Sequence, residues 1–157
     1  MRDRVAGRAQ RSSENGYRRA DDDSQPCLSL AGCMPLYWTI DSKDRLFTAG
    51  GEGEVSLADA MSLLDALAGA GALSYRKLFD GRAVQSSMTG EELLTVCAKI
   101  RAYHAQGPVG ALAIVCTPEQ TVTFAPLLGA LAAADRPIKM FPSLLQAQTW
   151  LGHHRGN

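Results

Sequence analysis

The chain has 157 residues, of which 46% are hydrophobic, and its 16 basic side chains balance its 16 acidic ones. This length suits one compact domain with its own core. The balanced charge offers no broad positive surface for nucleic acid or an anionic membrane, and no apolar run approaches the ~20 residues that span a bilayer.

The N-terminal residues 1–33 are rich in Arg, Asp, Ser and Gly and contain few large apolar side chains. Such a segment buries too little surface to offset its ordering entropy, so we predict disorder there. It also lacks the apolar core of a secretory signal, which favours a cytoplasmic protein. The apolar pattern begins after Met34, at the boundary of the expected domain, so the preceding residues reflect either a choice of translation start or a dispensable extension. We expect a domain over residues 34–152 and a frayed terminus over 153–157.

The domain opens with a predicted β-hairpin. Residues 36–40 and 45–49 are rich in aromatic and β-branched side chains, and residues 41–44 between them are turn formers. The strand is then expected to end at Gly50, Gly51 and Gly53. A helix is expected to follow, with Ser56 as its N-cap.

The rest of the domain alternates strands with helices. The expected strands are 75–79, 111–116 and 138–141, and the expected helices are 90–104, about 120–133 (with Pro126 in its first turn or at a kink) and one after Ser143. The resulting order is β-β-α-β-α-β-α-β-α. Short connections imply right-handed crossovers, so we predict an α/β fold with a small, mixed, largely parallel sheet of about five strands and four helices.

The histidines are poorly placed for catalysis. His104 falls at the far end of its helix, where it suits the helix dipole, and His153 and His154 lie near the C-terminus. A nucleophilic serine needs a base within hydrogen-bond reach. Metal-ligand spacing and a phosphate-cradling loop are both missing from the sequence. We therefore expect a protein that is not an enzyme and has no cofactor or metal.

Ligands and partners of open parallel sheets bind beyond the carboxyl ends of the strands. That rim is expected to collect the residues that follow the third and fourth strands, together with the polar loop before the helix that starts near residue 90. The candidate binding residues are Asp80, Gly81, Arg82, Ser86, Ser87, Thr89 and Thr117.

The two serines allow two interpretations. Thr89 and Glu92 form a Thr-x-x-Glu capping box, so Ser86 and Ser87 lie just outside a helix N-terminus. Backbone N–H groups there favour a phosphate, but Glu91 and Glu92 oppose a second negative charge. The loop is either unmodified, which these charges favour, or a phosphorylation site whose added charge repels a docked partner.

The order of elements, the run Leu78-Phe79-Asp80 and the pair Ser86-Ser87 together resemble a STAS domain of the anti-sigma-factor-antagonist (SpoIIAA-like) type, over about residues 36–151. In that family the loop reads Asp-Ser-Ser-Gly, and a partner kinase phosphorylates its first serine. Gln85 and Met88 stand here in the places of the Asp and the Gly. The chain looks still more like small stand-alone SpoIIAA-like bacterial proteins, through Met34-Pro35-Leu36, Tyr75 to Arg82, and Ala147 to Leu151.

The resemblance implies binding rather than turnover. The expected partner is a protein, such as a kinase or an anti-sigma-like regulator. The shared fold with lipid-binding Sec14-type domains implies an alternative, a small apolar ligand in a cavity lined by residues such as Phe79, Phe124 and Trp150.

The opening hairpin also carries large aromatic side chains at an exposed sheet edge. Tyr37, Trp38 and Phe47 either cover the domain's own core, which we favour, or form the contact of a homodimer.

Overall fold

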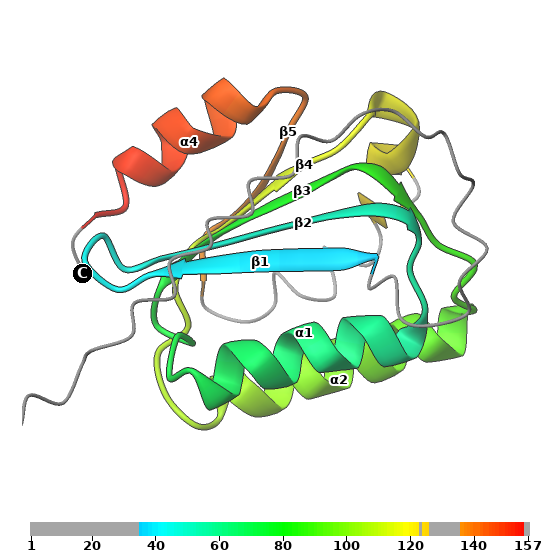
Figure 1. The fold of residues 1–157 in the computed structure, drawn as a ribbon, viewed down its shortest axis with the longest axis horizontal. Helices are drawn as coiled ribbons and strands as arrows, with labels where there is room; N and C mark the ends of the chain where they lie inside the picture. The colour runs from blue at the N-terminus through cyan, green and yellow to red at the C-terminus, as the bar shows by residue number, and fades with distance from the viewer. Residues whose placement is uncertain (1–34, 123, 126–135, 156–157) are drawn as a thin grey trace, which may run out of the picture. The chain divides into compact units, whose positions relative to one another are not determined.

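The structure, a computed structural model, describes residues 35–122, 124–125 and 136–155 and contains a five-stranded sheet (Figure 1). The strands lie side by side in chain order, and only the first pair is antiparallel. Their bounds are Leu36–Asp41 for β1, Leu46–Glu54 for β2, Arg76–Gln85 for β3, Leu112–Val115 for β4 and Ile138–Phe141 for β5. The mixed, largely parallel α/β sheet and the order of its elements are as predicted.

The predicted hairpin is confirmed. The side chain of Asp41 accepts a hydrogen bond from the backbone N–H of Asp44 at 2.9 Å, and Arg45 closes the turn in the left-handed region with φ of 49°. Of the hairpin aromatics, Phe47 is buried and Trp38 packs against the core that Phe47 joins, whereas Tyr37 is exposed. Two of the three therefore cover the domain's own core.

β2 is longer than expected, because its glycines continue the strand instead of ending it. Gly50 pairs with Tyr37 of β1 and Asp80 of β3, and Gly51 pairs with Leu36. A Cβ atom on Gly50 would lie 2.7 Å from the Tyr37 hydroxyl oxygen, and one on Gly51 would lie 2.7 Å from a Leu36 methyl carbon. Glycine therefore lets the side chains of β1 lie across β2.

β3 is also longer than expected. It was predicted to end at Phe79, but its pairing with β2 continues to Gln85, opposite Glu54. Its pairing with β4 stops earlier, where Asp80 meets Val115. The extended β2 supplies hydrogen-bond partners for the second half of β3, so Asp80, Gly81 and Arg82 lie inside the strand rather than after it.

Two long helices, α1 (Leu57–Gly69) and α2 (Gly90–His104), pack side by side against one face of the sheet (Figure 1). Both begin at the predicted capping boxes. Ser56 caps α1 with Asp59, and Thr89 caps α2 with Glu92. Each box satisfies N–H groups that the first helical turn leaves without a partner.

α4 (Leu144–Gly152) covers the opposite face of the sheet (Figure 1). The Ser143 hydroxyl accepts a hydrogen bond from the backbone N–H of Gln146 at 3.3 Å and so caps the helix that is expected after it. The helix packs onto side chains of β3, β4 and β5. The buried cluster on this face consists of Leu78, Ala111, Ala113, Val115, Phe141, Ala147 and Leu151.

The helix predicted over about 120–133 is described only in part. Residues 118–122 and 124–125 are helical, so the helix begins earlier than expected, because Thr117 accepts a hydrogen bond from the backbone N–H of Gln120 at 3.3 Å. Pro126 and the rest of that prediction lie outside the described residues, as do residues 1–33.

Candidate functional site

The connection from β3 to α2 carries the two serines, and both are exposed. The Ser87 hydroxyl donates a hydrogen bond to the carboxylate of Glu54, the last residue of β2. The Ser86 hydroxyl accepts from the Met88 backbone N–H at 3.3 Å, and the Thr89 N–H donates to the Glu92 carboxylate at 2.7 Å. The structure thus brings Ser86, Ser87 and Thr89 together, between the end of β2 and the start of α2.

Asp80 and Arg82 form an ion pair within β3. The Arg82 guanidinium donates from Nε to Asp80 Oδ1 at 2.9 Å and from Nη2 to Oδ2 at 2.7 Å. These bonds hold the pKa of the Asp80 carboxyl below its ordinary value. Because side chains alternate along a strand, Asp80 and Arg82 share the face of Leu78, which α4 covers. Within the described chain, no hydrogen bond or ion pair joins them to Ser86 or Ser87.

Thr117 is linked to β3 through Gln120, a residue that the sequence analysis missed. The Gln120 side chain accepts from the Thr117 backbone N–H at 2.8 Å and donates to the carbonyls of Gly81 and Val84 at 3.0 and 2.9 Å. The sequence did hold a signal, because Thr117-x-x-Gln120 is itself a capping-box pattern. The bridge ties the helix after β4 to the extended half of β3.

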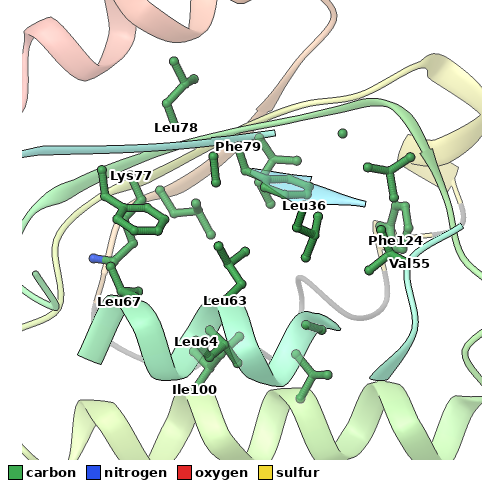
Figure 2. A pocket seen from close by; sticks show the side chains of 18 of the residues that line it. Leu36, Val55, Leu63, Leu64, Leu67, Lys77, Leu78, Phe79, Ile100 and Phe124 are labelled. Atoms are coloured by element: carbon green, nitrogen blue, oxygen red, sulfur yellow. The ribbon is translucent and has the colours of Figure 1, made fainter. Parts of the chain in front are cut away.

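A cavity of about 260 Å³ lies between the sheet and the helices α1 and α2 (Figure 2). Phe79 and Phe124 line it, in agreement with the expected apolar-ligand cavity. Trp150 does not, and this part of the expectation is wrong, because α4 carries Trp150 to the opposite face, where it contacts Phe141 at 5.6 Å between ring centroids. Most of the remaining lining is aliphatic, and it includes Leu36, Val55, Leu63, Leu64, Leu67, Leu73, Val84, Leu93, Val96, Ile100, Leu112 and Ile114.

Lys77 and Arg136 are the charged residues among the described residues of this lining, and the side chain of Lys77 is buried. The Lys77 amine donates hydrogen bonds to the backbone carbonyls of Leu73 and Tyr75 at 2.5 and 2.7 Å. Burial, with a smaller contribution from the positive charge of Arg136, lowers the pKa of Lys77 to about 7. Sequence patterns do not predict this burial, because a lysine in a strand usually faces solvent.

The described residues provide little for metal chemistry. Within residues 35–122, 124–125 and 136–155, no group of three or more His, Cys, Asp or Glu side chains could hold a metal ion. Cys97 and Cys116 are free and buried. In the same ranges, no helix is long and apolar enough to cross a membrane.

Of three comparisons with known proteins, the one with solved structures finds a similar fold. Neither models of protein families nor the curated proteins contain a match to this chain. Among solved structures, the chain is similar to an anti-sigma factor antagonist from Mycobacterium paratuberculosis, with a TM-score of 0.51 and 20% sequence identity over 78% of this chain and 99% of that chain. The described domain therefore has the STAS-type fold of the anti-sigma factor antagonists, as the resemblance in the sequence implied.

Proposed function

We propose that the chain is a non-catalytic, cytoplasmic regulatory module of the STAS type that binds a protein partner through residues 80–89 and helix α2. The observation that carries the proposal is an exposed apolar residue beside the serine loop. Leu94 lies in the second turn of α2 and is 58% exposed. Because the Leu94 side chain is uncovered in the domain, a protein partner could bury it.

The serine loop can regulate such a contact by charge. Ser87 already donates to the Glu54 carboxylate, and Glu91 and Glu92 occupy the first turn of α2. A phosphate on Ser86 or Ser87 would add negative charge beside these acids, and so would weaken the docking of a partner whose surface is acidic or apolar. The structural neighbour, an anti-sigma factor antagonist, supports an anti-sigma-like regulator as the partner, and a kinase is the other partner that the resemblance in the sequence implies.

Two exposed leucines provide a matched test of the surface. Leu94→Glu changes α2, whereas Leu145→Glu makes the same change on α4, where Leu145 is 74% exposed. With a partner captured by cross-linking and then purified, we expect Leu94→Glu to weaken binding at least ~10-fold and Leu145→Glu to leave it unchanged. Both variants should keep the thermal midpoint, because neither leucine is buried. Equal binding by both variants would remove α2 from the contact.

The serines are tested with the same purified partner. Ser86→Asp and Ser87→Asp should each weaken binding, while Thr149→Asp on α4 should not. Analysis of intact mass and phosphorylated peptides on the same sample would show whether Ser86 or Ser87 is modified. If neither Ser86→Asp nor Ser87→Asp changes the affinity for the partner, the charge switch is excluded. The Leu94 contact is then judged from its own variants.

A second candidate function, binding of a small apolar ligand, is favoured by the cavity between the sheet and α1 and α2. Protein interiors are normally close-packed, so an apolar space of about 260 Å³ is unusual and is large enough for a small ligand. Native mass spectrometry of freshly purified protein should reveal retained mass that denaturation releases. A bare spectrum, together with no binding of any added amphiphile, would exclude this candidate.

A further inference from the structure

The cavity differs at its two ends (Figure 2). Val55 and Phe124 lie at one end, and Lys77 lies at the other, while Leu63 of α1 and Ile100 of α2 line the side that faces the sheet. The end at Lys77 carries charge, whereas Ser86 and Gln120, the polar residues nearer Val55, are neutral and donate hydrogen bonds to backbone carbonyls. A cavity with one charged end suits an apolar ligand that has one charged group.

The charge at the Lys77 end of the cavity is positive. Among the described residues that line the cavity, Lys77 and Arg136 carry charge, and none is an Asp or a Glu. An ammonium group has three N–H donors. Two of those on Lys77 reach neutral backbone carbonyls. The lining therefore contains buried positive charge without a carboxylate beside it.

Among the residues that the structure describes, two further nitrogens near Lys77 are buried and have no hydrogen-bond partner there, Nε of Arg136 and Nε2 of His104. His104 ends α2, as predicted, but burial lowers its pKa, and the charges of Arg136 and Lys77 lower it further. Burial also lowers the pKa of Arg136 to about 10. The three bases are thus close enough to repel one another. Buried polar nitrogens are normally paired, so the unpaired Nε–H donor of Arg136 indicates a missing acceptor.

The size of the cavity limits what that acceptor can belong to. An apolar protein cavity of ~150 Å³ holds benzene, so a cavity of about 260 Å³ holds a chain of roughly ten carbons. This volume matches a single chain of medium length.

We propose that the cavity binds a single-chain amphiphile with an anionic head, of the medium-chain fatty carboxylate class, and that Lys77 and Arg136 receive the head. This inference rests on the second candidate function. The carboxylate accepts hydrogen bonds from the unused donors of these side chains, and the alkyl chain extends toward Val55 and Phe124. A neutral apolar ligand would leave the same donors unpaired, at a cost to its affinity.

Decanoate and 1-decanol separate the charge of the head from the apolar chain. Both have ten carbons, and losing the hydration of a carboxylate costs more than losing that of a hydroxyl, so a preference for decanoate requires a cationic site. Calorimetric titration of the delipidated full chain should show decanoate binding at least ~10-fold more tightly than 1-decanol.

Lysine variants test whether Lys77 causes the preference for decanoate over 1-decanol. Lys77→Met keeps the length of the side chain and removes its charge, so it should abolish the preference for decanoate while 1-decanol still binds. Lys99→Met is the matched control, because Lys99 pairs with Asp65 at 2.5 Å and does not line the cavity. Arg136→Met gives a second, independent removal of charge if Lys77→Met fails to fold.

The outcomes distinguish the two proposals. If neither amphiphile binds the wild-type protein, the second candidate function fails and this inference fails with it. If both bind equally, or if Lys77→Met and Arg136→Met keep the preference, the anionic head is excluded but binding of an apolar ligand stands. A decanoate preference that Lys77→Met abolishes and Lys99→Met retains supports the inference.

Discussion

Lys77 is the second residue of β3, and strand alternation turns its side chain toward α1 and α2 rather than toward solvent. Its neighbour Leu78 points the other way, into the core under α4. The ammonium group is therefore held in an apolar environment, where two backbone carbonyls replace only part of its hydration.

Lys77 should make the stability of the ligand-free protein depend on pH. Its pKa falls from 10.5 to about 7 in the folded state, so between these values the unfolded chain binds a proton that the folded protein has released. Raising the pH removes this advantage of the unfolded state. From pH 7 to 10, wild type should gain on the order of 3 kcal/mol of unfolding free energy relative to Lys77→Met. Urea denaturation across this range measures the difference, and parallel pH curves would contradict the shifted pKa.

At the scale of elements, the connection from α2 to β4 fits closely against the start of β3. The Gly110 N–H donates to the carbonyl of Leu73 at 3.0 Å. A Cβ atom on Gly110 would lie 2.2 Å from the carbonyl oxygen of Tyr75 and 2.6 Å from that of Ser74. Because both obstacles are backbone atoms, a side chain here cannot be accommodated by a rotamer change. The two segments would have to move apart.

Gly110→Ala should therefore destabilise the fold, by roughly 2–3 kcal/mol in the free energy of unfolding. Gly69→Ala is the matched control, because a Cβ atom at the end of α1 would meet nothing within 4 Å. It should change stability by less than about 1 kcal/mol. Chemical denaturation of both variants tests the contact. A Gly110→Ala variant as stable as Gly69→Ala would show that the connection is not packed against β3 in solution.

At the scale of the whole domain, the two faces of the sheet are packed differently. Under α4, small and large apolar side chains from β3, β4 and β5 pack against Leu151, which is 2% exposed. Under α1 and α2, Leu67 is 5% exposed but borders the cavity. A side chain beside a cavity lacks partner atoms on one side and gains less dispersion energy from its surroundings.

The same Leu→Ala substitution should therefore lower the free energy of unfolding by different amounts on the two faces. Leu151→Ala is expected to lower the free energy of unfolding by about 3–5 kcal/mol, and Leu67→Ala by about 2 kcal/mol, in ligand-free protein. Both remove the same atoms from a buried leucine on a helix, so each serves as the control for the other. Denaturation curves with the same m-value make the comparison valid. Equal costs would indicate that the face under α1 and α2 is filled in solution.

The sequence by itself determined the features that depend on neighbouring residues. The hairpin turn at Asp41, the helix starts at Ser56, Thr89 and Ser143, and the alternation of strands and helices were all predictable, because capping and turn formation need only side chains a few positions apart. With short connections, this alternation restricts the topology to a largely parallel sheet.

Only the tertiary structure decided the features that depend on residues far apart in the chain. β3 runs on to Gln85 because β2 supplies a pairing partner as far as Glu54. Trp150 is turned away from the cavity because α4 crosses the opposite face of the sheet. Lys77 and Arg136 meet at the cavity because parallel pairing aligns the starts of β3, β4 and β5. Each of these depends on which segments pack together, and hydrophobic periodicity along the chain does not contain that information.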